Sequence, residues 1–244
     1  MIRGLYSAAD GLLVQAARID VISGNLAGAS VAGYRRDVPF VRAFTRTLEY
    51  AAAEGAAGVV GDQVLVAPGT WVDLTPGALR HTGGDFDVAL EGPGYFCVET
   101  RSGEAYTRGG ALRLDGSGVI VTAGGDPVLG RAGPIRIAGG EVEFSENGDV
   151  LVDGARVDRL KLADLAPGVA VEKLGGGLLR AEAGFVRAAA DVRVRQGYLE
   201  AANVDVIGEM AGMISALRAF EASQRALQAN DETLAKAINE IARV

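Results

Sequence analysis

Proline is confined to the middle of this chain of 244 residues. All seven prolines lie between Pro39 and Pro167, so the first 38 and the last 77 residues lack the strongest helix breaker. Of the 35 glycines, 27 lie between residues 51 and 196, many of them in pairs that are typical of turns. This distribution predicts a long helix at each end of the chain and a turn-rich sheet between them.

Composition and charge exclude several classes of protein. Hydrophobic residues make up 49% of the chain, so disorder over its whole length is not expected. The net charge of −7 repels phosphate backbones and disfavours a nucleic-acid partner. A single cysteine, Cys97, and a single histidine, His81, are too few for an internal disulfide or a histidine-based zinc site. No uninterrupted apolar run exceeds four residues, so no membrane insertion is expected.

The middle of the chain reads as a series of short strands. Turn signals at 115–118 and 146–149 lie between apolar runs, where Asp-Gly and Asn-Gly supply the positive φ of tight hairpins. The runs lie at 86–91, 95–100, 119–122, 141–144, 149–152 and 156–165. Their spacing predicts a central all-β domain of short antiparallel strands.

Apolar seams run along both ends of the chain. Near the C-terminus, eleven positions recur at alternating steps of four and three, and nine of them are apolar. They are Val206, Met210, Met213, Leu217, Phe220, Gln224, Leu227, Asp231, Leu234, Ile238 and Ile241. The N-terminal seam has the same spacing and comprises Ile2, Leu5, Ala9, Leu12, Ala16, Ile19, Ser23 and Leu26. Such a repeat favours a supercoil, so we predict an α+β fold whose long terminal helices pack as a coiled coil.

The C-terminal seam is too long for this chain to cover by itself. A helix over residues 198–242 is roughly 65 Å long at 1.5 Å per residue. A compact domain formed by the middle residues is only about 40 Å across. The overhanging apolar side chains therefore need a partner, because an uncovered helix has little intrinsic stability. The alternative is a pair of ordinary amphipathic helices that lie on the β domain.

Three blocks of residues resemble the bacterial flagellar rod and hook proteins. The first block, 25–36, is similar to the family signature N-L-A-N-x-x-T-x-G-[FY]-[KR], although Gly28 and Val31 depart from it. The second block, 87–96 with 105–110, is similar to the first hairpins of the family's central domain. The third block, 197–205 with the seam up to Glu221, is similar to the start of the C-terminal helix. The blocks stand in the family's order along nearly the whole chain.

The resemblance implies a structural role without catalysis or a cofactor. Proteins of this family are exported unfolded by the flagellar type III apparatus without a cleaved signal peptide. They then polymerise in the periplasm into a hollow shaft, whose inner tube is lined by the terminal helices. The expected partners are therefore copies of this chain, other rod subunits and the export apparatus, and the expected location is the basal-body rod.

The expected assembly interface combines the seams with the turn that follows the first helix. Gly33 suits a backbone position with positive φ, and Tyr34 is an amphipathic anchor for a neighbouring helix or subunit. Asn203 is expected to cap the second helix. The predicted interface residues are Leu5, Leu12, Ile19, Asn25, Leu26, Gly33, Tyr34, Asn203, Val206, Met210, Met213, Leu217, Phe220, Leu227, Leu234, Ile238 and Ile241.

Chemical sites are poorly supported by the sequence. Asp85, Asp87 and Glu91 share one face of a strand, but three carboxylates on a strand make a poor cation cage. A hydrolytic triad needs His81 as its base, and no serine stands in a Gly-x-Ser-x-Gly elbow. Cys97 reads as a small buried hydrophobic residue. We therefore expect no enzyme and no metal site.

The predicted domains are an N-terminal rod helix and turn (1–35), a linker or extended segment (36–75), the central β domain (76–196) and a C-terminal rod helix (197–244). The short length and the runs 127–135 and 159–162 resemble proximal-rod members of the family more than distal-rod members. The alternatives are a distal-rod subunit and a coiled-coil adaptor whose β domain binds a ligand.

Overall fold

The computed structural model describes residues 2–50, 58–166, 168–182, 184, 186–189 and 191–241. Within these residues it has two α-helices, α1 (Ile2–Gly28) and α2 (Val206–Ile241), and a mostly β body between them. The strands are β1 (Asp37–Tyr50), β2 (Gly58–Val72), β3 (Leu79–His81), β4 (Val88–Glu91), β5 (Tyr95–Thr100), β6 (Gly103–Thr107), β7 (Arg113–Leu114), β8 (Ile120–Val121), β9 (Val142–Phe144), β10 (Asp149–Val152), β11 (Ala155–Arg159), β12 (Leu162–Leu165), β13 (Val171–Gly175), β14 (Leu178–Ala181), β15 (Val186–Ala188), β16 (Arg193–Gln196) and β17 (Tyr198–Glu200).

The chain forms two compact units. The helix–hairpin unit contains α1 up to Leu26, the segment Asp37–Trp71, and α2. The β unit contains Ala27–Arg36 and Val72–Asp205. No described helix is both long and apolar enough to cross a membrane.

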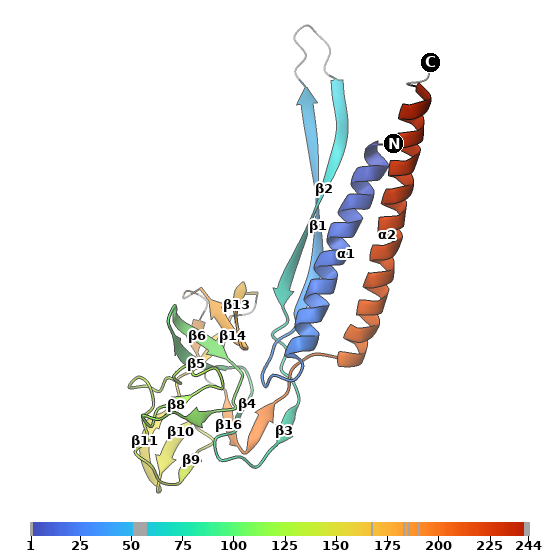
Figure 1. The fold of residues 1–244 in the computed structure, drawn as a ribbon. Coiled ribbons are helices and arrows are strands. Elements are labelled where there is room, and N and C mark those ends of the chain that lie inside the picture. Colours follow the sequence, from blue (N-terminus) through green and yellow to red (C-terminus); the bar gives the residue numbers. More distant parts are fainter. Residues whose placement is uncertain are drawn as a thin grey trace. The chain divides into compact units, whose positions relative to one another are not determined.

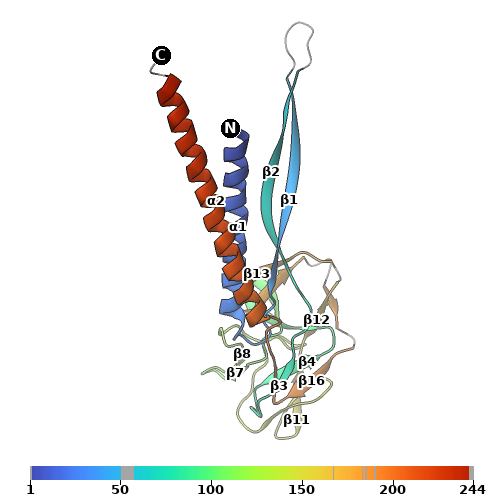
Figure 2. The same ribbon diagram turned by 90° about the vertical axis from the view of Figure 1, so that its right-hand side faces the viewer.

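In the helix–hairpin unit, α1 lies between α2 and the hairpin formed by β1 and β2 (Figure 1, Figure 2). The two helices are in contact at two glycines: a Cβ added at Gly212 would lie 3.5 Å from Cδ1 of Ile22, and one at Gly11 would lie 3.5 Å from Oγ of Ser223, both ordinary van der Waals distances. A two-stranded hairpin is marginally stable alone in water. Packing against α1 therefore stabilises it.

The predicted coiled coil of two long terminal helices is wrong. Within the described residues, the ends of the chain form two single helices, and the seams do not pair as predicted. Val206, Met210 and Leu217 of the C-terminal seam are 42, 55 and 44% exposed, whereas the fully buried α2 residue is Ala216, which the seam omits. The physical reason is that α1 gains cover from the β1–β2 hairpin. The segment 36–75, expected to be a linker or extended segment, supplies this hairpin.

The β unit is built from antiparallel pairs around two apolar clusters. Its largest sheet has the order β13-β14-β6-β5-β12-β15, and β11-β10-β9 form a second sheet. Phe96, Val98 and Ile120 are fully buried in the larger cluster. The turn at 146–149 is confirmed, because Gly148 of the Asn-Gly pair has a φ of +82°; at 115–118 the positive φ, +76°, belongs to Gly118 and not to Gly116 of the Asp-Gly pair.

One predicted strand divides into two. The run 156–165 forms β11, which pairs with β10, and β12, which pairs with β5 in the other sheet. The chain changes sheet at Leu160 and Lys161, where the Leu160 amide donates to the carbonyl of Gly148 and the Lys161 amide donates to the carbonyl of Leu129. Hydropathy alone does not mark such a change, because both strands bury apolar side chains.

Candidate assembly interface

The two sides of α2 differ in residue size and exposure. The side toward α1 carries the buried Ala216 and the half-buried Met213, Phe220, Leu227 and Leu234. The opposite side carries Ile207, Met210, Ile214 and Leu217, which are 82, 55, 55 and 44% exposed and which we name the outer stripe. The predicted seam therefore mixes two faces: Met213, Phe220, Leu227 and Leu234 point inward, whereas Val206, Met210 and Leu217 are exposed.

In α1, the predicted interface residues are more covered. Leu12, Ile19 and Leu26 are half-buried. Asn25 is almost completely buried: its side-chain amide donates to the Asp37 carbonyl at 2.8 Å and to Oε1 of Glu209 at 3.1 Å, and its Oδ1 accepts from the Asp37 amide. Asn25 thus ties α1 to the start of β1 and to α2. The side chains of Leu5, Ile238 and Ile241 lie outside the described part of the chain.

Three segments of the β unit meet at a junction, which we define as residues 33–36, 73–77 and 200–203. Asn203 connects them, because its Oδ1 accepts from the Arg36 amide at 2.7 Å and its Nδ2 donates to the carbonyls of Asp73 and Thr75 at 2.9 and 3.0 Å. The predicted helix cap at Asn203 is therefore wrong. Helix α2 begins at Val206, so the residue that directly precedes it is Asp205.

A buried charge cluster lies at the junction. Glu200 pairs with Arg35 at 2.7 Å and with Arg108 at 3.0 Å, and all three side chains are at most 4% exposed. Glu200 Oε1 also accepts from the Gly77 amide at 2.8 Å. Burial lowers the pKa of Arg108 and the nearby Arg35 adds to this, while Glu200 opposes both. One carboxylate thus pairs with two buried cations.

No pattern in the sequence indicates this cluster. Arg108 and Glu200 are 92 positions apart. They lie in the blocks 105–110 and 197–205, which the sequence marks only by family resemblance. A charged residue in a strand is normally read as solvent-exposed, and no local pattern reports a partner so distant in sequence. A buried ion pair depends on tertiary contacts that periodicity does not encode.

Gly33 has the positive φ that was expected, at +68°. Its amide donates to the Glu200 carbonyl at 2.8 Å, which brings the first segment of the junction against the third. A Cβ at this position would collide with the backbone carbonyl of Arg108. Gly33 is therefore required both for its φ value and for the close approach of two backbones.

We expect Gly33→Ala to lower the free energy of unfolding of the β unit by about 2–4 kcal/mol, because it combines backbone strain with a steric clash. Urea unfolding monitored by circular dichroism measures the change. Gly176→Ala is the matched control, since Gly176 has a φ of +59° but open space around its Cβ position. If the two variants lose equal free energies of unfolding, the clash with the Arg108 carbonyl does not contribute to the effect.

Tyr34 packs inside the β unit. Its ring occupies the space where a side chain at position 28 would lie, so Gly28 makes room for it. Lys173 Nζ lies 4.2 Å from the ring centroid, a cation–π distance. Glycine at position 28, where the family signature has asparagine, thus leaves room for the Tyr34 ring. The role of Tyr34 toward a neighbouring subunit stays a prediction.

Asp73 holds the second junction segment. Burial opposes its ionisation, but hydrogen bonds from the Thr75 hydroxyl and amide and from Arg36 outweigh it, so the pKa of the Asp73 carboxyl lies below its usual value. A lowered pKa in the folded state means that ionised Asp73 stabilises the fold above its unfolded pKa. This contribution is lost as pH falls through the folded pKa.

We expect wild-type protein to lose more stability than Asp73→Asn when the pH is lowered from 7 to about 3. The asparagine side chain does not titrate, so the variant lacks this source of acid sensitivity. Urea unfolding of both proteins at several pH values measures the difference. Identical pH profiles would contradict a stabilising role for the Asp73 carboxylate.

The residues considered as catalytic or metal-binding candidates make contacts that stabilise the fold. His81 contacts the ring of Tyr198, with centroids 4.9 Å apart. Cys97 is fully buried in β5, and burial raises the pKa of its thiol to about 12. Glu91 pairs with Arg195 at 3.0 Å. Across the described residues, no three carboxylate, histidine or cysteine side chains gather into a possible metal site.

Comparison with known protein families identifies the family of this chain. The model of the flagellar basal-body rod FlgEFG protein C-terminal family matches residues 195–240, and that of the flagellar hook protein FlgE/F/G D1 domain matches residues 89–152. The basal-body rod protein FlgG of Bacillus subtilis (strain 168) is 30% identical over 262 residues, which cover 98% of this chain and 99% of that protein. This chain belongs to the flagellar rod and hook protein family.

Other relatives in this family carry the name FlgF. The basal-body rod protein FlgF of Escherichia coli (strain K12) is 31% identical over 241 residues, which cover 89% of each chain. FlgF of Caulobacter vibrioides is 27% identical over 248 residues, which cover both chains completely. The family resemblance read from the sequence is confirmed, and with it the expectation of a structural protein rather than an enzyme.

Proposed function

We propose that this chain is a structural subunit of the flagellar basal-body rod, which polymerises in the periplasm and transmits motor torque. The observation that carries the proposal is the outer stripe: four large apolar side chains on one face of α2 are 44–82% exposed. Apolar surface of this kind marks a protein interface. In a family of rod and hook proteins, the partners are other rod subunits and further copies of the chain.

The predicted interface residues on α1 and α2 are part of this proposal. Those on the inner face of α2 hold the helix–hairpin unit together, and those on the outer face are available to a neighbour. The junction has a mechanical role in the β unit. Its dense hydrogen bonds and buried ion pairs resist displacement of the three segments under load, and a shaft requires such stiffness.

We assign the chain to the proximal rod as a FlgF-like subunit, with a distal-rod FlgG-like subunit as the alternative. Alignment with FlgF of Caulobacter vibrioides covers both chains completely within 248 positions, whereas alignment with FlgG of Bacillus subtilis extends over 262 positions. The shorter alignment needs fewer insertions, which favours the FlgF-like assignment. Export by the flagellar type III apparatus belongs to the same proposal.

Labelling of the protein along isolated basal bodies tests the proposal. We expect label in the rod, and at its proximal end for a FlgF-like subunit. Label at the distal end would support the FlgG-like alternative, and basal bodies without label would overturn the rod assignment. Analytical ultracentrifugation separates the rod function from an adaptor function, because an adaptor forms a small oligomer of fixed size, whereas a rod subunit is monomeric or polymerises without a fixed limit.

A further inference from the structure

The outer stripe lies on the exposed side of α2, turned away from the α1 helix of its own chain. At 100° per residue, Ile207 and Ile214 lie roughly 160–180° around α2 from Ala216, the residue most buried on the side toward α1. The stripe extends over residues 207–217, which is about 15 Å along the helix. Glu221 follows Leu217 by one turn and places an exposed carboxylate on the same face.

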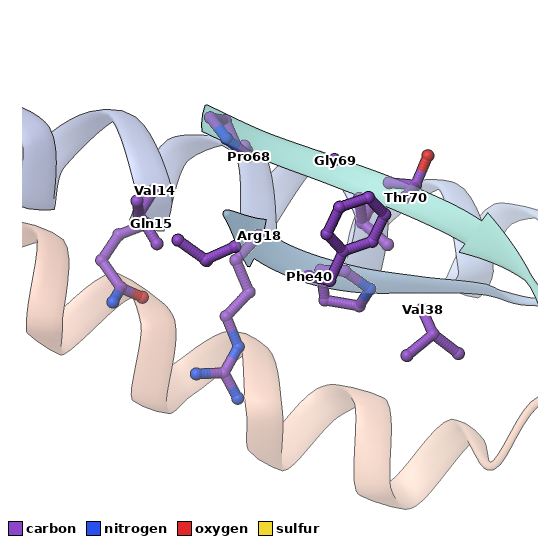
Figure 3. A pocket seen from close by; sticks show the side chains of 12 residues that line it. Val14, Gln15, Arg18, Val38, Phe40, Pro68, Gly69 and Thr70 are labelled. Atoms are coloured by element: carbon purple, nitrogen blue, oxygen red, sulfur yellow. The ribbon is translucent and has the colours of Figure 1, made fainter. Parts of the chain in front are cut away.

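A groove of about 620 Å³ lies on another part of the same unit, between α1 and the β1–β2 hairpin (Figure 3). It is mainly apolar and extends along α1 from Val14 to Val21, about 11 Å. The Phe40 ring packs over Gly69, in the space that a Cβ at that position would take, and both residues line the groove. The buried Oε1 of Gln15, which lines the groove, has no hydrogen-bond partner among the described residues.

The groove also carries a positive charge. Arg18 is the cation among the residues that line it, and its side chain is exposed. In Figure 3 this side chain extends away from Phe40 and is drawn across the ribbon of α2. An apolar surface bordered by a cation is complementary to an apolar stripe that ends in a carboxylate, and the two are of similar length.

We propose that the outer stripe of one copy of this chain docks in the α1–hairpin groove of the next copy, with Glu221 of the first beside Arg18 of the second. The inference rests on the proposed function and names the surfaces through which copies join. The donor and acceptor surfaces differ, so each docked copy presents a free stripe and a free groove to further copies. Such a heterologous contact repeats without closing, as a shaft requires.

Cross-linking in isolated basal bodies tests the contact directly. Leu217→Cys and Thr70→Cys place one thiol on the stripe and one at the groove, in subunits that are co-expressed and treated with a bifunctional maleimide. We expect a covalent dimer that needs both variants, because either thiol alone lacks its partner. The native Cys97 is fully buried and does not compete. Incorporated subunits that give no dimer, or that cross-link to a different rod protein, overturn the inference.

Charge exchange provides a second test that does not depend on the cross-linker. We expect Arg18→Glu and Glu221→Arg each to reduce incorporation on the order of tenfold, and a subunit that carries both changes to restore it. Glu232→Arg is the control, since it makes the same charge change on an exposed part of α2 beyond the stripe. Failure of the double variant to recover contradicts the pairing of Arg18 with Glu221.

The two proposals fail in different ways. Absence of the wild-type protein from basal bodies overturns the rod function itself. Normal incorporation of the wild type, together with unchanged incorporation of both single charge variants, overturns the docking contact and leaves the rod function intact.

Discussion

Glu200→Gln is expected to lower the free energy of unfolding of the β unit by about 3–5 kcal/mol. The variant keeps an acceptor for the Gly77 amide but removes the only carboxylate paired with Arg35 and Arg108 among the described residues. Both guanidinium groups are almost completely buried, so water does not replace the lost partner. The cost is the free energy of leaving two cations unpaired in the interior. Urea unfolding at pH 7 measures it.

An exposed ion pair supplies the control. Glu91→Gln removes the carboxylate that pairs with Arg195, where the side chains are 49 and 44% exposed, and we expect a change below about 1 kcal/mol. Adding Arg108→Met to Glu200→Gln is expected to recover part of the loss, because one unpaired cation is removed. If the Glu200 and Glu91 variants are equally stable, the buried cluster does not stabilise the junction.

Leu217→Asp is expected to abolish motility without destabilising the free subunit by more than about 0.5 kcal/mol. Leu217 is 44% exposed on the outer stripe, so an aspartate there stays hydrated until a neighbouring subunit covers it. Burial of the unpaired charge then costs several kcal/mol of assembly free energy. Swimming assays and urea unfolding of the purified variant measure the two effects separately.

Phe220→Asp provides the contrast on the inner face. Phe220 is half-buried on the side of α2 toward α1, so the aspartate is expected to destabilise the helix–hairpin unit by about 2–4 kcal/mol and to abolish motility as well. Ser215→Asp, exposed in the same turn as Ile214, is the control and should leave swimming unchanged. Normal swimming of both the Leu217 and the Phe220 variants would refute an assembly role for α2.

The seam on α2 illustrates what periodicity can and cannot predict. Steps of four and three placed Met213, Phe220 and Leu227 correctly on one side, because helical geometry fixes which residues share a face. The same steps also predicted that Met210 and Leu217 lie on that side, but both are exposed on the outer stripe. A helix with apolar residues on two faces has more than one consistent seam, and the small residues Gly212, which lies beside Ile22, and Ala216, which is fully buried, carry little hydropathy signal.

The β1–β2 hairpin shows a second limit of sequence reasoning. The segment 36–75 lacks short turn signals at regular spacing, and its two strands of 14 and 15 residues are much longer than those of the central region. Its stability depends on packing against α1, which lies elsewhere in the sequence. Neither strand length nor this packing partner is encoded by local propensity.

The sequence by itself determined the positions of the helices, the tight turns and the family. Proline and glycine act through local backbone geometry, and the blocks at 25–36 and 197–205 indicate the family by direct resemblance. Neither inference requires knowledge of distant contacts. Only the tertiary structure decided which face of α2 is covered, which strands lie beside α1, and that Glu200 pairs with Arg35 and Arg108. Burial and ion pairing depend on residues far apart in the chain, so they are defined only once the elements have packed.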